Sequence, residues 1–166
     1  PHTVGVYDFG RTGDGSFYYA MELLDGMDLY SLVRRFGPMP PARVAHVLRQ
    51  VCNSLAEAHA QGLVHRDVKP GNIQIGQRGL DPDFCWVLDF GLVKDVRTAP
   101  GYQPHITVEG AMPGTPAFMA PEMATGGRGV DHRADLYALG CVGYFLLTGR
   151  EVFAGDSDVS VAVQHV

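Results

Sequence analysis

The stretch HRDVKPGNIQIGQRGLDPDFCWVLDFG at residues 65–91 carries side chains suited to moving a charged group. The Asp67 carboxylate can accept a proton from an attacking hydroxyl, and the Lys69 ammonium can neutralise negative charge on a group in transfer. Asn72 and Asp89 offer the hard oxygen ligands that magnesium prefers.

The two ends of this stretch are expected to meet in space. A short strand around Gln74, a turn over residues 76–82 and a second strand over residues 84–88 form a predicted β-hairpin. Such a hairpin places Asn72 and Asp89 at neighbouring strand ends. That proximity is what a shared magnesium site requires.

Composition excludes several classes of partner. The 166 residues carry 13 Lys and Arg against 18 Asp and Glu, a net charge of -5, which provides no basic field for nucleic acid or an anionic membrane. The three cysteines stand far apart in sequence and predict neither a disulfide framework nor a zinc site, which fits a reducing cytoplasm. The longest apolar run, residues 136–148, is interrupted by glycines and too short to span a bilayer, so no membrane segment is expected within this chain.

Before the central stretch, the sequence predicts a hairpin followed by two helices. Apolar and polar residues roughly alternate over residues 4–9, a polar turn covers residues 11–16, and an aromatic-rich strand covers residues 17–24. A short helix over residues 29–36 is stopped by a Gly-Pro pair, and a Pro-Pro pair starts a long helix that reaches residue 60.

The long helix carries an apolar stripe at helical spacing, which predicts core packing. Its members are Val44, Val47, Leu48, Val51, Cys52, Leu55, Ala56 and His59. A Cys/His nucleophile built from His46, Cys52 and His59 is the competing interpretation. Packing is favoured, because a small apolar cysteine within such a stripe is far more often a packed side chain.

After the central stretch, the sequence changes from an irregular segment to a strongly apolar one. Residues 92–113 lose periodicity and predict a loop. Residues 131–148 predict a helix that is apolar nearly all round and therefore buried. Beyond Arg150 the sequence gives no clear structural signal.

The motif pair HRDVKPGN and DFG resembles the catalytic loop and the metal loop of eukaryotic-type protein kinases, in form and in order. The string GTPAFMAPE at residues 114–122 resembles the family's substrate-side loop, and DHRADLYALG at residues 131–140 resembles the start of one of its helices. Lys69 and Thr115 resemble the serine/threonine branch of the family. Residues 87–94 are similar to bacterial members.

The resemblance implies an α+β, protein-kinase-like fold that is partial in this chain. Residues 1–24 would be a remnant of the small β lobe, with two strands and the start of the hinge. Residues 25–166 would be the helical large lobe, truncated at its C-terminus. The family's glycine-rich loop, its third-strand lysine and its paired helix glutamate have no match in the 166 residues. The isolated chain is therefore expected to have little or no kinase activity.

The implied reaction is transfer of the γ-phosphoryl group of ATP to a serine or threonine hydroxyl of a protein substrate. Asp67 would act as the base and Lys69 would hold the phosphoryl oxygens. Asn72, a member of the catalytic loop, and Asp89 would hold Mg²⁺, or Mn²⁺ in its place. ATP and Mg²⁺ are thus the implied cofactors.

Further residues match the family's nucleotide pocket. Met21 would be the gatekeeper, the backbone of Glu22 and Leu24 would bond the adenine, and Asp28 would contact the ribose. From the residues alone, Asp28 could equally support the start of the short helix that follows it. Gln74 falls where the family has an apolar floor under the adenine, so it either turns toward solvent or alters nucleotide affinity.

Four residues are expected to be structural. His65 and Phe90 would stack in the apolar column that joins the two lobes, and Glu122 would pair with an arginine beyond the end of the chain. Asp135 has two readings: a first-turn carboxylate favourable to the helix dipole, or the family's buried aspartate that braces the catalytic loop. The match of the surrounding residues favours the second reading.

Regulation is implied by Arg66, which would pair with a phosphate on the segment between DFG and APE and so order that segment. Thr107, eight residues before Thr115, is favoured as the phosphate carrier, with Thr98 second. In a kinase dimer, one copy would phosphorylate this threonine on the other copy.

The protein would act in the cytoplasm. A membrane anchor in a part of the protein outside this chain is compatible with these motifs.

Two other functions compete with an active protein kinase. A pseudokinase would keep the fold as a binding or scaffold module, but the presence of Asp67, Lys69, Asn72 and Asp89 argues against it. A small-molecule phosphotransferase would share the aspartate and asparagine of the loop. It should lack the segment at residues 114–122, which is present, so it ranks last.

Overall fold

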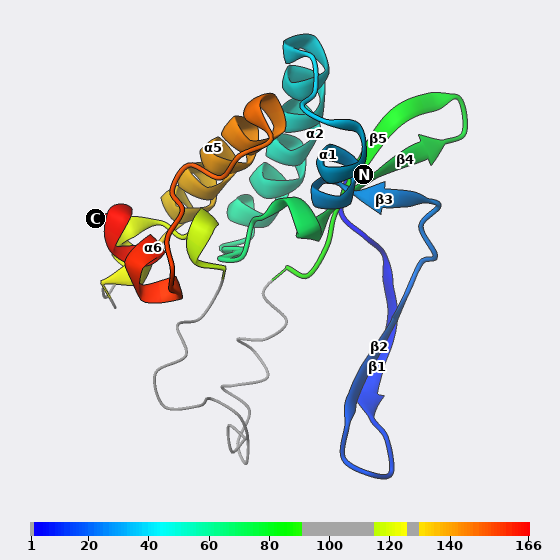
Figure 1. Ribbon diagram of the computed structural model, residues 1–166. Helices are drawn as coiled ribbons and strands as arrows, with labels where there is room; N and C mark the ends of the chain where they lie inside the picture. Colours follow the sequence, from blue (N-terminus) through cyan, green and yellow to red (C-terminus); the bar gives the residue numbers. More distant parts are fainter. Residues whose placement is uncertain (1, 91–114, 126–129) are drawn as a thin grey trace.

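The computed structural model describes residues 2–90, 115–125 and 130–166 (Figure 1). Within these residues the chain forms a two-stranded hairpin, a three-stranded sheet and a group of helices packed beside that sheet. This mixed architecture agrees with the α+β class expected from the sequence. The division into residues 1–24 and 25–166 stays a prediction.

The first hairpin consists of β1 (Val6–Arg11) and β2 (Phe17–Met21), which pair antiparallel with Phe9 opposite Tyr19. The predicted hairpin is confirmed, although its first strand covers residues 6–11 in place of 4–9, and its second strand ends at residue 21 in place of 24. Figure 1 shows the hairpin extending away from the body, and nearly all of its side chains are exposed.

The second sheet has the order β3 (Gly26–Asp28), β4 (Ile73–Arg78) and β5 (Asp81–Val87), all antiparallel. The hairpin of β4 and β5 is confirmed, but its strands are longer than predicted and leave only residues 79–80 between them. The sequence analysis missed β3, because three residues give too short a pattern to show a period.

The chain before the first hairpin is attached to this sheet. Thr3 forms a parallel bridge with Val87, and the Val87 amide donates to the carbonyl of His2 at 2.8 Å. The Val4 amide donates to the carbonyl of Val87 at 3.2 Å. The base of the projecting hairpin is therefore fixed to the edge strand β5.

Two glycines lie opposite each other where β3 meets β4. Gly26 pairs with Gly76, and a Cβ on Gly26 would overlap the carbonyl oxygen of Ile75. A Cβ on Gly76 would overlap the carbonyl oxygen of Asp25. The two strands can approach this closely only because neither position carries a side chain.

Two helices follow β3 along the chain and match the predicted bounds closely. Helix α1 (Leu29–Phe36) begins at Asp28, whose carboxylate accepts from the Ser31 amide at 2.8 Å, and ends at Gly37 with a φ of 83°. Helix α2 (Pro41–Ala60) has proline at its first position, where the missing N–H costs nothing.

The buried face of α2 differs in part from the predicted stripe. Val44, Val47, Val51 and Leu55 are buried, as expected. The prediction that Cys52 is packed is wrong: its side chain is exposed, as is that of Ala56. The helix instead buries Gln50, Ser54 and Ala58. The two polar side chains have hydrogen-bond partners there, because Gln50 bonds the Asp83 carbonyl on β5 and Ser54 bonds Thr3 in the N-terminal segment.

Polar side chains join α2 to β5. The Arg43 guanidinium donates from Nε and Nη2 to the two carboxylate oxygens of Asp83, at 2.7 and 2.6 Å. Gln50 Nε2 donates to the Asp83 carbonyl at 2.8 Å, and Gln50 Oε1 accepts from the Cys85 amide at 3.0 Å. These bonds fix the sheet against the helix.

Burial raises the pKa of the Cys85 thiol to about 12, so this thiol stays protonated.

Helix α5 (Arg133–Thr148) lies beside α2 in Figure 1 and packs against it. The prediction that this helix is buried all round is wrong, because Leu136, Tyr144 and Leu147 are about half exposed. Its opposite face, which includes Phe145, is buried in the core. The sequence analysis did not foresee α6 (Asp158–Gln164), which begins with a capping box formed by Ser157 and Ser160.

The core lies between α2, α5 and the inner face of the second sheet. Its largest fully buried side chains include Phe145, Leu29, Leu55, Ile73 and Leu146. No helix within the described residues is both long enough and apolar enough to cross a membrane.

Candidate active site

The predicted catalytic residues lie together after α2: Asp67 and Lys69 are on the loop that leads to η1 (Pro70–Asn72), a short 3₁₀ turn, and Asn72 ends that turn. Lys69 Nζ lies 2.7 Å from Asp67 Oδ2. Asn72 Nδ2 donates to the Asp67 carbonyl at 2.8 Å and to Asp67 Oδ2 at 3.0 Å. The Asp67 carboxylate is therefore held by its own loop, beside a cation.

The fourth predicted residue, Asp89, follows directly after β5 and Leu88. The Leu88 amide donates to the Asn72 carbonyl at 2.9 Å, so the backbones of the two predicted metal ligands are adjacent. Asp89 has a φ of 58°, in the left-handed region, and its side chain is exposed. Its Oδ1 accepts from the Tyr19 hydroxyl at 3.0 Å, and this hydrogen bond raises the Tyr19 pKa.

These donors fit a small, hard cation such as Mg²⁺. Asn72 uses its Nδ2 for both bonds to Asp67, which leaves the carbonyl oxygen as a metal donor. Asp89 keeps Oδ2, because the Tyr19 bond is to Oδ1. Mg²⁺ is commonly bound through one or two protein oxygens, with water and phosphate oxygens in its other positions, so these two donors suit it.

His65 is buried, and both of its ring nitrogens have partners. Nε2 donates to the Leu88 carbonyl at 2.8 Å, and Nδ1 accepts from the Asp67 amide at 3.3 Å. The ring packs against Phe90 with 4.8 Å between centroids. This geometry suits a structural side chain and leaves His65 no free nitrogen for proton transfer.

Asp135 lies under the loop and is fully buried. Its Oδ2 accepts from the His65 amide at 2.9 Å and its Oδ1 from the Arg66 amide at 2.7 Å. His59 Nε2 donates to Oδ2 at 2.7 Å. Asp135 thus contacts the catalytic loop as expected for a buried aspartate that braces it. The same contacts hold the backbone of Arg66 at a φ of 65°.

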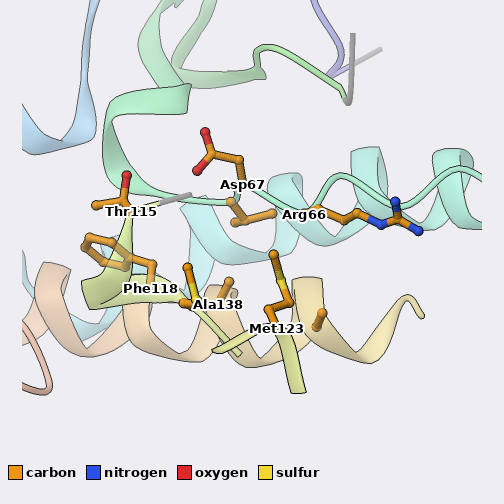
Figure 2. Close-up of a pocket in the computed structure, with 9 residues that line it drawn as sticks. Arg66, Asp67, Thr115, Phe118, Met123 and Ala138 are labelled. Atoms are coloured by element: carbon orange, nitrogen blue, oxygen red, sulfur yellow. The ribbon is translucent and has the colours of Figure 1, made fainter. Parts of the chain in front are cut away.

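A small pocket lies between this loop and the segment that begins at Thr115. Figure 2 shows Asp67 above Ala138 and Met123, with its carboxylate pointing away from them, and Thr115 and Phe118 together at the left. Phe118 belongs to η2 (Pro116–Phe118), and Met123 belongs to α4 (Pro121–Ala124). The structure thus brings the predicted base and the predicted substrate-loop threonine to one pocket.

Arg66 also lines this pocket, and its side chain extends away from Asp67 in Figure 2. Its Nε atom is buried and has no hydrogen-bond partner among the described residues. Thr98 and Thr107, the predicted phosphate carriers, and Gly91 of the DFG motif lie outside the described residues. Pairing of Arg66 with a phosphate therefore stays a prediction.

The predicted nucleotide residues lie along β2, the segment after it and β3. Met21 ends β2 opposite Val6. The Glu22 amide donates to the Gly5 carbonyl at 3.0 Å, and the Glu22 carboxylate accepts from the Gly5 amide at 2.8 Å. Leu24 is half-buried. An adenine contact of the Glu22 and Leu24 backbone stays a prediction.

Asp28 and Gln74 are neighbours across β3 and β4. Asp28 Oδ1 accepts from the Ser31 amide at 2.8 Å, and Asp28 Oδ2 accepts from the Ser31 hydroxyl at 2.7 Å. Asp28 therefore supports the start of α1. Gln74 is half-buried, which leaves open both alternatives for its amide. Glu122 lies in the first turn of α4, and no ion pair to it occurs among the described residues.

Sequence reasoning missed two side chains that contact the site. His59 was assigned to packing, yet it bonds Asp135; a polar residue at a core-facing helix position was the available signal. Tyr19 was treated as an ordinary strand residue, yet it bonds Asp89, which lies 70 residues away in sequence. No local pattern could have shown the second contact.

Comparison with known proteins identifies the family of this chain. The protein kinase domain matches residues 1–166, and the chain belongs to the protein kinase domain family. Members of this family in general use ATP and a divalent metal and act on proteins.

Individual relatives are bacterial serine/threonine-protein kinases. The chain is 42% identical over 166 residues to serine/threonine-protein kinase pkn3 of Myxococcus xanthus, covering 100% of this chain and 30% of that kinase. It is 41% identical over 169 residues to serine/threonine-protein kinase PknB of Mycobacterium leprae, covering 100% of this chain and 26% of that kinase. The chain therefore spans less than a third of the length of either relative.

A solved structure supports the fold. The crystal structure of Rad53 1-466 in complex with AMP-PNP matches with a TM-score of 0.74 and 28% identity. The match covers 99% of this chain and 38% of that chain. The fold is thus protein-kinase-like, and this chain represents part of it.

Proposed function

We propose that the protein carrying this chain transfers the γ-phosphoryl group of ATP to serine or threonine hydroxyls of protein substrates. The observation that carries the proposal is the cluster of Asp67, Lys69 and Asn72, with Asp89 beside it across the β4–β5 strand ends. The names of the bacterial relatives support the same reaction.

Asp67 is the group that receives the proton of the attacking hydroxyl. Asp67 and Thr115 both line the small pocket between the catalytic loop and the segment that begins at Thr115, so the proposed base lies beside the proposed substrate loop. The bond from Asn72 to Oδ2 limits rotation of the carboxylate. This positioning, more than any covalent chemistry, is what phosphoryl transfer requires of a protein.

Lys69 and the metal donors act on the phosphates. Lys69 Nζ lies 2.7 Å from Asp67, where it can also contact oxygens of a phosphoryl group moving toward the acceptor. Asn72 and Asp89 would hold the divalent ion. That ion, when bound, neutralises charge on the nucleotide phosphates.

The test is phosphoryl transfer by the full-length protein with ATP and Mg²⁺ on a protein substrate. Asp67→Asn should lower kcat by about 10²- to 10⁴-fold, the usual contribution of a positioned base. Asp131→Asn is the matched control, because Asp131 pairs with Arg133 and is not among the residues that line the pocket. Full activity of folded Asp67→Asn protein would refute the proposal.

Regulation by phosphorylation is part of the proposal. We infer that Thr107 carries the activating phosphate and that Arg66, whose buried Nε is unpaired among the described residues, is its partner. After incubation with ATP, phosphopeptide mapping should find Thr107 modified, with Thr98→Ala as the matched control for Thr107→Ala. If a second copy performs the reaction, the rate per molecule rises with protein concentration. Label that persists unchanged in Thr107→Ala protein would contradict this assignment.

The proposed compartment is the cytoplasm. Cys52, Cys85 and Cys141 are all free thiols, which supports a reducing environment.

A further inference from the structure

Tyr19 connects the projecting hairpin to the predicted metal ligand. Its hydroxyl donates to Asp89 Oδ1 at 3.0 Å, although the two residues are 70 positions apart. No other hydrogen bond to the Asp89 carboxylate occurs among the described residues. The hairpin and the metal loop therefore meet through this pair.

The position of Tyr19 suits a polar role better than a packing role. Within this chain its side chain is 44% exposed, and its hydroxyl bonds the Asp89 carboxylate. Tyr18, the next residue on β2, is exposed to the same degree and bonds Asp8 Oδ2 at 3.2 Å within the hairpin. Two adjacent tyrosines thus bond two different aspartates, and only one of these aspartates belongs to the site.

Asp89 requires such a partner. Its backbone lies in the left-handed region and its side chain is exposed, so burial does not restrict the carboxylate. The Tyr19 hydroxyl holds Oδ1 and leaves Oδ2 for a metal ion. A ligand that is already oriented loses less conformational entropy when the ion binds.

We propose that Tyr19 is a positioning residue for the metal ligand Asp89, through the hydrogen bond from its hydroxyl to Oδ1. The inference rests on the proposed function, because it takes Asp89 as a metal ligand. It adds a side chain from the hairpin to a metal site whose other proposed protein residues are Asn72, at the end of η1, and Asp89, two residues after β5.

Mn²⁺ binding tests the proposal independently of turnover. The probe is Mn²⁺ titrated into full-length protein with a non-hydrolysable ATP analogue, with free Mn²⁺ followed by electron paramagnetic resonance. Tyr19→Phe should raise the Kd for Mn²⁺ by about three- to tenfold, the range expected for loss of one hydrogen bond to a charged group at an exposed site. Tyr18→Phe, the matched control, should leave the Kd unchanged.

Two outcomes would overturn the proposal. An unchanged or tighter Kd in Tyr19→Phe would show that the hydroxyl does not orient the carboxylate. Asp89→Asn separates this failure from failure of the proposed function: it should abolish Mn²⁺ binding at the site. If Asp89→Asn binds Mn²⁺ like the wild type, both the metal assignment and the role of Tyr19 are wrong. If Asp89→Asn loses binding and Tyr19→Phe does not, only the role of Tyr19 is wrong.

Discussion

The catalytic loop and the β1–β2 hairpin contribute to one candidate site but are supported in very different ways. Asp135, His59 and His65 hold the loop through hydrogen bonds at a buried position. The hairpin exposes most of its large side chains, namely Val6, Tyr7, Phe9, Phe17, Tyr18 and Tyr19. The loop is thus part of the core, whereas the hairpin depends on its base and on few side-chain contacts.

This difference indicates how the two parts respond to perturbation. The loop should unfold only with the whole domain, because its bonds are buried between α2 and α5. The hairpin is attached through residues 2–4, through the contact between Glu22 and Gly5, and through Tyr19. It should open locally at a much lower free energy. The residues proposed for proton and phosphoryl transfer therefore lie on the part of the chain that is held by buried contacts.

The largest expected effect comes from removing the buried brace of the loop. Asp135→Ala leaves the amides of His65 and Arg66 and the His59 ring without their acceptor, and should lower the free energy of unfolding by about 3–5 kcal/mol. Urea unfolding of the chain measures this loss. Asp131→Asn, which keeps an oxygen for the Arg133 amide and removes only a solvent-accessible ion pair, should lower the urea midpoint much less. Equal losses in the two variants would contradict the bracing role.

Deletion of one aromatic ring from each region compares them directly. Phe145 is 1% exposed, and Phe145→Ala should cost about 3–5 kcal/mol because it opens a cavity in the core. Phe9 is 78% exposed, and Phe9→Ala should cost less than about 0.5 kcal/mol. Urea unfolding of the two variants under identical conditions provides the test. A cost for Phe9→Ala near that for Phe145→Ala would show that the hairpin is packed after all.

Hydrogen exchange should separate the two regions without mutation. Amides of β1 and β2 should exchange at least about tenfold faster than those of β4 and α2, because the hairpin opens without global unfolding. Mass spectrometry of peptides from each element gives the rates. Similar protection of β1 and β4 would mean that the hairpin and the body form one cooperative unit.

The smallest expected effect is a pH dependence in the body. His165 is buried against Tyr137 and Phe153, and this burial lowers its pKa below the usual 6.5. Since the unfolded chain takes up this proton first, stability should be unaffected above pH 6.5 and should fall as the pH drops below it. His165→Gln should show a shallower decline in urea midpoint between pH 7.5 and pH 5.5 than the wild type, with an effect of about 1 kcal/mol or less. An identical pH profile in the two proteins would show that His165 does not couple protonation to folding.

Local signals in the sequence predicted much of the fold. Asp28, Gly37 and the prolines before residue 42 mark the ends of α1 and α2, because capping depends on residues next to the helix. The β4–β5 hairpin and the neighbouring positions of Asn72 and Asp89 were also predicted, since they follow from a short strand–turn–strand pattern.

Other features depend on contacts that no local pattern contains. Cys52 matches the apolar stripe in composition, but the actual face of α2 is fixed by Gln50 and its partners on β5, which sequence spacing does not show. The exposed face of α5 was missed because a wholly apolar pattern cannot tell which side meets the core. The contact of Tyr19 with Asp89 depends on where the hairpin lies relative to the body.

The facing glycines of β3 and β4 limit which sequences this domain can tolerate. Even alanine at Gly26 or Gly76 would overlap the backbone of the opposite strand, so a mutational library should be depleted of every substitution at these two positions. Gly13, in the tip of the hairpin, has no heavy atom near the position of a Cβ and should accept many residues. Variation should therefore accumulate at the end of the hairpin and be excluded where the chain enters the body.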